Sequence, residues 1–136
     1  MKKHLKIDKT AQCVGCRLCE LTCSVFHEGV FAPWLSRIIV RRNESIALAQ
    51  PSICHQCNEA KCQSACSTHA IMPDKNGILT INYELCNGCG ECVIACPFQT
   101  MGMNHTEQRA YKCDLCDEDP QCVKICPAHV LTVEVS

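Results

Sequence analysis

Cysteine spacing constrains this chain more than any other feature of its sequence. Residues 86–97 read CNGCGECVIACP, where four thiols follow the spacing C-x2-C-x2-C-x3-C and a proline closes the run. All sixteen cysteines fall into four such quartets, with none left over. From first to fourth, the quartets are Cys13, Cys16, Cys19 and Cys23; Cys54, Cys57, Cys62 and Cys66; Cys86, Cys89, Cys92 and Cys96; and Cys113, Cys116, Cys122 and Cys126. Whatever the fold, it has to accommodate groups of four thiols.

The composition leaves little else to hold the chain together. Sixteen of 136 residues are cysteine, a share above the roughly 8–10% that indicates a cysteine-built scaffold. Only six residues are aromatic: three Phe, two Tyr and one Trp. An apolar core would be thin for this length. The cysteines are therefore expected to supply the cohesion, in a single domain over residues 1–136.

Charge and hydropathy limit which partners and which cellular compartment are expected. The net charge of −1 gives no electrostatic reason to bind nucleic acid. No run reaches the ~18 apolar residues that span a bilayer, so no direct membrane insertion is expected. The start, MKKHLKIDKTAQC, has no apolar core of a secretory signal. The expected location is the cytoplasm, where cysteines bind metal more often than they form disulfides.

The quartets form an internal repeat. The first and third share the spacing x2, x2, x3, whereas the second and fourth have x2, then four or five residues, then x3. The segments LKIDKTAQ and LTINYEL precede Cys13 and Cys86, and CSTHAI and CPAHVL end the second and fourth quartets. An alternating order of this kind indicates a duplication. It also accounts for His69 and His129, which occupy matching positions and are expected to be structural.

The expected fold class is α+β, with β-hairpins and short helices around the metal sites. THAIMPDKNGILTINYEL places two apolar runs around a turn at residues 74–77, which predicts a β-hairpin. The x3 segments contain no helix breaker and are expected to form short helical turns. Residues 36–42, SRIIVRR, resemble a strand, and residues 43–50, NESIALAQ, are expected to form a short helix before Pro51.

Three bonding partners compete for the thiols. Disulfides need an oxidising compartment, and neighbours in a tight C-x2-C-x2-C run are poorly placed to pair. Zinc uses two C-x2-C pairs, so the third cysteine of the first and third quartets would be surplus. The C-x2-C-x2-C-x3-C-P motif instead fits bacterial ferredoxins, in which the fourth cysteine binds the other cluster. Sixteen thiolates suit four [4Fe-4S] clusters without remainder.

Hairpin connectivity predicts which quartets exchange their fourth cysteine. The hairpin joins the second quartet to the third, and strand-like ends of the chain, HLKIDKTAQC and CPAHVLTVEV, would rebuild the same unit if they paired. Pairing the first quartet with the second, and the third with the fourth, stays open as an alternative. The expected ligand sets are set 1, Cys13, Cys16, Cys19 and Cys126; set 2, Cys23, Cys113, Cys116 and Cys122; set 3, Cys54, Cys57, Cys62 and Cys96; and set 4, Cys66, Cys86, Cys89 and Cys92.

This pairing divides the chain into two ferredoxin-like units related by pseudo-two-fold symmetry. The inner unit is expected at about 51–100. The outer unit combines about 1–24 with 108–136 and is circularly permuted through the chain termini. A connecting segment at about 24–50 holds Trp34, Phe26 and Phe31, aromatic residues near arginines that are typical of docking surfaces.

The four quartets and the lead YKCDLC resemble the four-cluster iron–sulfur subunits of the dimethyl sulfoxide reductase and formate dehydrogenase type. In that family the second quartet pairs with the third and the first with the fourth. The segment CVGCRLCELTCSVFHEGVFAPWLSRIIV is similar to small polyferredoxin subunits of tungsten-dependent aldehyde oxidoreductases and related acyl-coenzyme A reductases. Similar stretches occur in ferredoxin partners of carbon monoxide dehydrogenases and hydrogenases. The chain lacks the long insertions and membrane-anchoring tail of larger members, which favours a soluble complex.

The resemblance implies an electron-transfer subunit without a catalytic site of its own. It would relay single electrons between a catalytic oxidoreductase subunit, in the first place a tungsten-dependent aldehyde oxidoreductase, and a redox acceptor or donor. The alternative partner is a carbon monoxide dehydrogenase, hydrogenase or formate dehydrogenase. Further expected partners are a flavin- or nicotinamide-linked subunit, a soluble ferredoxin, or copies of the chain in a filament. An enzyme or sensor reacting at an open iron, and a metal-stapled module without redox function, are competing classes.

The sequence also suggests roles for several other side chains. Lys112, beside Cys113, either raises the potential of a nearby cluster, meets an acidic partner, or is simply solvated. Arg37, Arg41 and Arg42 are expected on a solvated strand face. Met101 and Met103 are expected as apolar cover over a cluster rather than as ligands.

Overall fold

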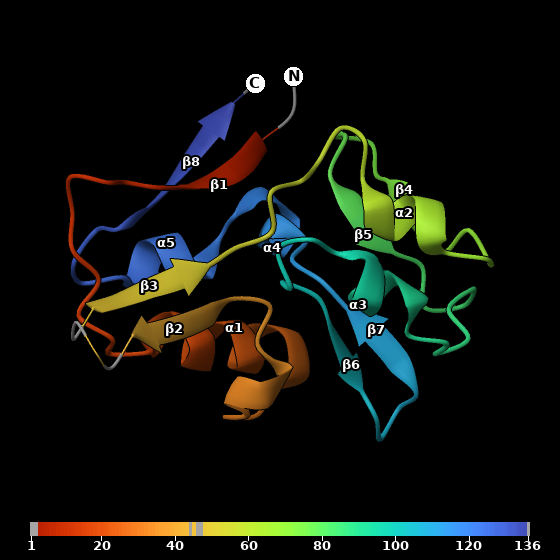
Figure 1. Cartoon of the computed structure of the whole chain (residues 1–136), viewed down its shortest axis with the longest axis horizontal. Helices are drawn as coiled ribbons and strands as arrows, with labels where there is room; N and C mark the ends of the chain where they lie inside the picture. Colours follow the sequence, from red (N-terminus) through yellow and green to blue (C-terminus); the bar gives the residue numbers. More distant parts are fainter. Residues whose placement is uncertain (1–2, 44, 46–47, 136) are drawn as a thin grey trace.

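The computed structural model describes residues 3–43, 45 and 48–135. In this part of the chain, short helices alternate with four antiparallel strand pairs (Figure 1). The helices are α1 (Leu18–Glu28), the 3₁₀ turn η1 (Pro33–Leu35), α2 (Lys61–Ala65), α3 (Glu91–Ala95), α4 (Leu115–Glu118) and α5 (Gln121–Ile125). The strands are β1 (Lys3–Ile7), β2 (Ile39–Asn43), β3 (Leu48–Ser52), β4 (Ile71–Pro73), β5 (Leu79–Ile81), β6 (Gly102–Asn104), β7 (Arg109–Tyr111) and β8 (Leu131–Val135). The expected mixture of hairpins and short helices is confirmed.

The two ends of the chain form one strand pair. β1 and β8 run antiparallel, with Leu5 opposite Val133 and Ile7 opposite Leu131, and both termini lie at the same edge of the molecule (Figure 1). Leu5 and Leu131 are buried on the inner side of this pair. The predicted pairing of the terminal strands is confirmed. It brings the first and fourth quartets, which follow and precede these strands, to the same part of the fold.

The inner hairpin forms where the sequence predicts it. β4 pairs with β5, with Ile71 opposite Ile81. The carboxylate of Asp74 accepts the backbone N–H groups of Asn76 and Ile78 at 2.8 and 3.1 Å, and Gly77 takes a φ of 82°. A short acidic side chain and a glycine at a positive φ are the local chemistry that closes such a turn.

The helix expected at residues 43–50 is wrong for the residues that the structure describes there; positions 44, 46 and 47 lie outside them. Leu48 to Gln50 belong instead to β3, which pairs with β2 and continues through Pro51 opposite Val40. Proline disfavours a helical residue before it, and a two-stranded sheet tolerates a residue without an N–H group. Pairing with β2 also buries Ala49 beside Val40, which a solvated helix would not do.

Helix α1 packs beneath this sheet through a buried carboxylate (Figure 1). Glu20 is 3% exposed and accepts the backbone N–H of Val40 at 2.6 Å and a bond from Arg17 at 3.0 Å. At the other end, Gly29 adopts a φ of +74° and donates its N–H to Val25, which closes the helix. The shorter helices α2, α3 and α5 lie where the x3 segments predict helical turns, and that prediction is confirmed.

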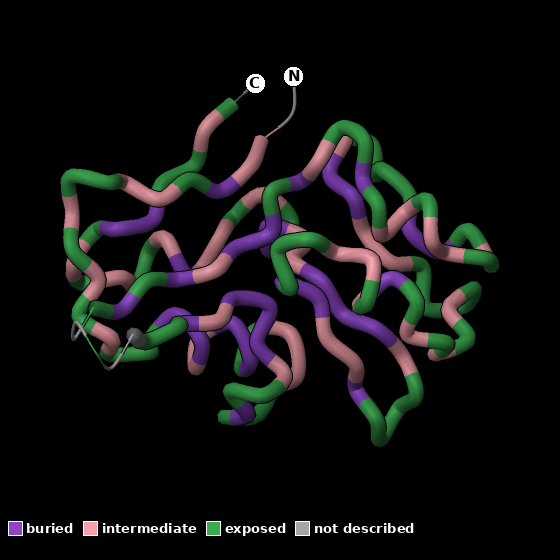
Figure 2. The backbone as a smooth tube through the Cα atoms, viewed as in Figure 1, coloured by how far each residue is buried: buried purple, intermediate pink, exposed green. Residues whose placement is uncertain are grey.

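Two apolar cores hold the described residues together, and both contain cysteine. Figure 2 shows the buried stretches of the backbone in purple. The larger core surrounds Cys19, Cys23 and Cys122 with residues such as Leu5 and Leu115. The smaller core lies between the inner hairpin and α3 and includes Cys92 and Met101. Because thiols occupy core positions, the stability of the fold depends on what those thiols bind.

The sequence did not predict one of the hairpins. β6 and β7 pair antiparallel between the third and fourth quartets, with Gly102 opposite Tyr111. The Tyr111 hydroxyl donates a hydrogen bond to the backbone carbonyl of Trp34 in η1. This hairpin thereby ties the connecting segment to the lead of the fourth quartet. Within the described residues, no helix has the length and apolar character needed to cross a membrane.

Candidate metal centres

Set 1 gathers around one small cavity. Its lining includes all four cysteines of the set, and the remaining walls come from residues such as Val40, Pro127 and Leu131. Cys13, Cys16 and Cys19 arrive from the first quartet, whereas Cys126 arrives from the end of α5. The pairing of β1 with β8 and the packing of α1 against α5 bring these distant segments together.

Set 3 gathers around a second cavity of the same kind. Cys54, Cys57 and Cys62 of the second quartet line it together with Cys96, the last cysteine of the third quartet. Met101 is 6% exposed and closes one side, so it covers the cavity with an apolar side chain as expected. Met103 is half-buried against the same core.

In sets 2 and 4, the charge on one cysteine sulfur affects the pKa of another. Burial, and then the charges of Cys116, Cys23 and Cys19, raise the pKa of Cys122 to about 12. Burial, and then the charges of Cys86, Cys62 and Cys66, raise the pKa of Cys92 to about 11. Cys116 and Cys23 of set 2 thus act on Cys122, and Cys86 and Cys66 of set 4 act on Cys92.

The same influences show which sets are neighbours. Cys19 of set 1 acts on Cys122 of set 2, and Cys62 of set 3 acts on Cys92 of set 4. Burial, and then the charge of Cys54 in set 3, raise the pKa of Cys113 in set 2. These pairwise influences join set 1 to set 2, set 2 to set 3, and set 3 to set 4. The two exposed cysteines of the chain, Cys16 and Cys89, belong to sets 1 and 4.

Burial raises the pKa of the third cysteine in every quartet. The pKa reaches about 12 for Cys19 and Cys122 and about 11 for Cys92, and it is also raised for Cys62. A buried thiol of this kind ionises only when a cation neutralises the thiolate. The arrangement suits thiolates that are formed by binding metal.

Hydrogen bonds lower the pKa of Cys23, Cys66 and Cys96, the fourth cysteines of the first three quartets, although burial opposes this. Although burial opposes it, contacts with His27 and the backbone N–H of Arg37 lower the pKa of Cys23. The Arg37 N–H lies 3.2 Å from the Cys23 sulfur, and the Ala70 N–H lies 3.2 Å from the Cys66 sulfur. Hydrogen bonds to cluster sulfurs are one determinant of reduction potential.

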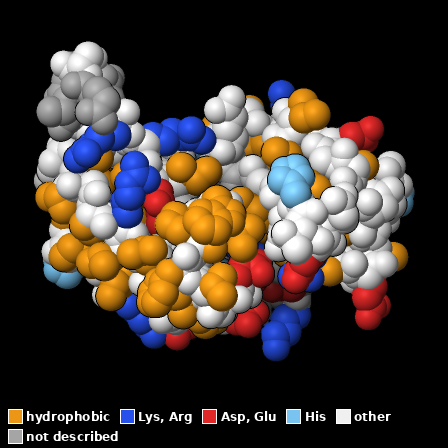
Figure 3. All heavy atoms as spheres, turned by 90° about the horizontal axis from the view of Figure 1, so that it is seen from below, with side chains coloured by type: hydrophobic (Ala, Val, Ile, Leu, Met, Phe, Trp, Pro, Cys, Tyr) orange, Lys and Arg blue, Asp and Glu red, His pale blue; other side chains and the backbone are white. Residues whose placement is uncertain are grey.

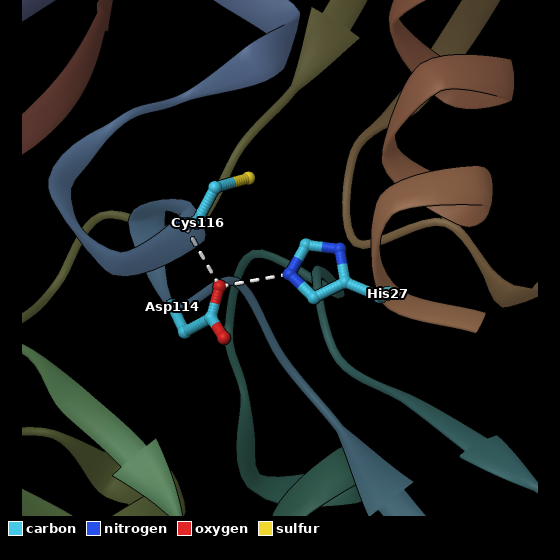
Figure 4. A group of neighbouring side chains, drawn as sticks. All are labelled: His27, Asp114 and Cys116. Atoms are coloured by element: carbon cyan, nitrogen blue, oxygen red, sulfur yellow. Dashed lines mark hydrogen bonds and ion pairs between the residues drawn. The ribbon is translucent and has the colours of Figure 1, made fainter. Parts of the chain in front are cut away.

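His27 is a site residue that the sequence analysis missed. Its Nδ1 lies 2.9 Å from the Cys23 carbonyl oxygen and 3.6 Å from the Cys23 sulfur, and its Nε2 lies 2.8 Å from Oδ1 of Asp114 (Figure 4). Although burial opposes it, hydrogen bonds with Asp114, Cys116 and Cys23 raise the pKa of His27 to about 12. The charged imidazole therefore ties α1 to the start of α4 beside set 2. Its position four residues after Cys23, one helical turn, was the only local signal.

The predicted location of Arg37 is also wrong. It is 5% exposed rather than solvated, pairs with Glu28 at 2.9 Å, and donates to the Leu35 carbonyl oxygen at 2.7 Å. It precedes β2 instead of lying on its open face, and the partly buried Glu28 carboxylate stabilises its charge. Arg41 and Arg42 are exposed, as expected. Lys112, in contrast, is buried.

His69 and His129 share an unusual backbone conformation. Their φ values are 57° and 54°, and their N–H groups donate to the carbonyls of Cys66 and Cys126, 3.3 Å away in each case. Both side chains are exposed. These matching turns are consistent with a structural role at the exit of each quartet.

An exposed apolar face lies over α1 and the segment that follows it (Figure 3). Phe31 and Trp34 are 76% and 74% exposed, and Phe26, Val25 and Val30 are exposed beside them in the chain. Exposed aromatic side chains in such a group mark interaction surfaces. We call these five residues the aromatic face.

The donors fit iron–sulfur chemistry. Four cysteines line each of the two cavities of sets 1 and 3. No carboxylate lines either cavity, and His55 of set 3 is the one histidine among the lining residues. Soft thiolates in apolar cavities are the donors that iron–sulfur clusters require. Cys19, the third cysteine of the first quartet, lines the cavity of set 1, whereas a zinc C-x2-C half-site would leave it unused.

Comparison with known proteins places this donor arrangement among electron carriers. Residues 46–136 match the 4Fe-4S dicluster domain family. The chain is 42% identical over 116 residues to the polyferredoxin-like subunit of an aliphatic sulfonate oxidoreductase from Pyrococcus furiosus, an alignment that covers 85% of this chain and 66% of that protein. It is 35% identical over 150 residues to the electron transport protein HydN of Escherichia coli, over 92% of this chain and 84% of HydN.

A solved structure shares the fold. A chain of the active site complex BamBC of benzoyl coenzyme A reductase superposes with a TM-score of 0.57 and 29% identity, over 98% of this chain and 80% of the other. The resemblance to polyferredoxin-like oxidoreductase subunits drawn from the sequence is thereby confirmed.

Proposed function

The chain belongs to the 4Fe-4S dicluster family of electron-transfer proteins, and on that premise we propose that it carries four [4Fe-4S] clusters as the electron relay of an oxidoreductase complex. One observation carries the proposal: a cavity collects three cysteines from one quartet and one from a distant quartet, in set 1 and again in set 3. Each bound cluster would supply one-electron chemistry.

The protein's own residues hold and insulate this relay. Sets 1 to 4 supply one thiolate for each iron, and the two apolar cores exclude water from Cys19, Cys92 and Cys122. Electrons pass along the sets in the order 1, 2, 3, 4 or its reverse. The exposed Cys16 and Cys89 make sets 1 and 4 the points of exchange with partners.

The partner is a large catalytic oxidoreductase subunit, which we assign first to the tungsten-dependent aldehyde oxidoreductase type. The sequence of residues 13–40 supports this assignment, and the named function of the Pyrococcus relative supports an oxidoreductase partner more generally. The aromatic face, together with the connecting segment 24–50, is the docking surface of that subunit. Cys23 of set 2 lies in the same helix, α1, so docking there would bring a partner close to the relay.

The two halves form one domain with an inner unit at about 51–100 and an outer unit formed by the chain ends. We propose that a pseudo-two-fold axis relates them. Antiparallel β1–β8 and β4–β5 pairs, and the matched turns at His69 and His129, support this relation. Sixteen cysteines in metal-binding spacing support a reducing compartment such as the cytoplasm.

Metal analysis tests the proposal directly. Anaerobically reconstituted protein is expected to bind about sixteen iron atoms and about sixteen acid-labile sulfides per chain, since each cluster holds four of each. Reduction with dithionite should bleach the brown colour and give an electron paramagnetic resonance (EPR) spectrum of interacting clusters. Four zinc atoms per chain, or a colourless protein after reconstitution, would exclude the relay. Co-purification of the native complex identifies the catalytic subunit by mass.

A further inference from the structure

Lys112 occupies an unusual position for a lysine. It directly follows Tyr111 of β7 and precedes Cys113, which is the first cysteine of the fourth quartet and belongs to set 2. Its side chain also lines the cavity of set 3, together with Leu79 and Met101. The residue is 4% exposed. Lysine is almost never fully buried unless its charge is compensated.

The hydrogen bonds of Lys112 cross the boundary between the inner hairpin and the fourth quartet. Its Nζ donates to the carbonyl oxygen of Leu79 at 2.7 Å and to that of Cys113 at 2.9 Å. Gln56, which lies between Cys54 and Cys57, joins the same two residues: it accepts the Leu79 N–H at 2.9 Å and donates to the Cys113 carbonyl at 3.0 Å. The ammonium group is therefore fixed where sets 2 and 3 meet.

The surroundings do not neutralise this charge with a carboxylate. In the described part of the chain, the ion pairs within 4 Å involve other cations, and the two acceptors of Lys112 are neutral carbonyls. An unpaired buried charge costs several kcal/mol. Sulfurs of sets 2 and 3 are the candidates for compensation, because Lys112 lines the cavity of set 3 and adjoins Cys113 of set 2. The charge of Lys112 in fact acts to lower the pKa of both Cys62 and Cys113, although burial outweighs it at each thiol.

We propose that Lys112 is a fixed positive charge shared by the two central clusters, which sets their reduction potentials above the values that the same thiolates would otherwise give. This inference rests on the proposed function, because it requires clusters in sets 2 and 3. A four-thiolate cluster is anionic, and reduction adds one more negative charge. A nearby ammonium in a low-dielectric interior stabilises the reduced form more than the oxidised form. Lys112 therefore raises the reduction potentials of the two clusters without being a ligand of either.

The test is redox titration of the reconstituted protein followed by EPR, with Lys112→Gln as the main variant. Glutamine removes the charge but keeps a polar side chain for the carbonyls. Two of the four midpoint potentials are expected to shift to more negative values, while the other two stay unchanged. Lys112→Arg retains the charge and is expected to leave all four close to wild type. Lys61→Met is the matched control, because Lys61 lines the same cavity but is exposed, so solvent screens its charge.

The outcomes separate this inference from the proposed function. Wild-type protein with about sixteen iron atoms, whose potentials are the same in Lys112→Gln, would overturn the role of Lys112 and leave the relay intact. Wild-type protein without iron would overturn the relay itself. If Lys112→Gln fails to retain iron, Lys112→Arg decides: wild-type iron content and potentials support the shared charge, and loss of iron with arginine as well overturns it.

Discussion

His27 and Asp114 lie 87 residues apart in the sequence, yet Nε2 of the imidazole is 2.8 Å from Oδ1 of the carboxylate. The contact joins α1, which carries the end of the first quartet, to the fourth quartet. The side chain of His27 is only 10% exposed. A bond of this kind supports the docking of the two ends of the chain around set 2.

Removing this contact should weaken the junction of the chain ends. His27→Ala leaves the partly buried Asp114 without its partner, and is expected to lower the free energy of unfolding by about 1–3 kcal/mol. Chemical denaturation of the iron-loaded protein, followed by circular dichroism, measures the change. His105→Ala serves as control, because the His105 side chain is exposed. Equal stability of the two variants would contradict a stabilising role for the His27–Asp114 pair.

Interleaved ligation makes a prediction about pairs of cysteine variants. Cys54→Ala and Cys96→Ala come from different quartets but line the same cavity, so each should lose or convert the same EPR signal. The double variant should then lose no further signal. Cys54→Ala combined with Cys92→Ala should affect two signals, because Cys92 belongs to set 4. If the Cys54/Cys96 pair instead removes two signals, each quartet binds its own cluster and the interleaving is wrong.

The aromatic face should carry binding energy but no iron. Phe31→Ala and Trp34→Ala are each expected to raise the Kd for the catalytic subunit tenfold or more, or about 1.4 kcal/mol, as for aromatic anchors of other interfaces. Iron content should stay at the wild-type level. Surface plasmon resonance with the purified catalytic subunit measures the affinity. Ile94→Ala provides the control, since Ile94 is 87% exposed on α3, outside the aromatic face. Unchanged affinity in both aromatic variants would place the docking surface elsewhere.

Two glycines with nearly the same backbone conformation should respond differently to alanine. At Gly29, φ is +74° and a Cβ would meet nothing within 4 Å, so Gly29→Ala should cost about 1–2 kcal/mol from backbone strain alone. At Gly88, φ is +76° and a Cβ would lie 2.3 Å from the backbone oxygen of Gln108. Gly88→Ala should therefore be clearly the more destabilising change in thermal unfolding monitored by circular dichroism. An equal loss of stability in Gly29→Ala and Gly88→Ala would show that the segment around Gln108 moves away without a cost in free energy.

The local sequence predicted the features that depend on short-range geometry. Cysteine spacing indicated thiolate ligation of iron–sulfur clusters, the Asp74–Gly77 segment predicted the inner hairpin, and the x3 segments predicted helical turns. In each case a few neighbouring residues contain all the necessary chemistry. Residues 43–50 show where this fails: Leu48 and Ala49 are compatible with a helix, and only pairing with β2 selects the strand.

The tertiary structure decided burial and long-range partners. Sequence spacing by itself determined that the thiols come in fours, because neighbouring cysteines are held at ligand distance by their own backbone. It did not reveal that Arg37 would be buried against Glu28, that His27 would reach Asp114, or that Lys112 would lie between sets 2 and 3. Those outcomes depend on segments far apart in the chain that meet only on folding. Burial removes water from the charged groups, so hydrogen bonds or ion pairs with these segments have to replace it. The local sequence thus determines which thiols can bind a cluster together, whereas tertiary packing determines which charged groups surround them.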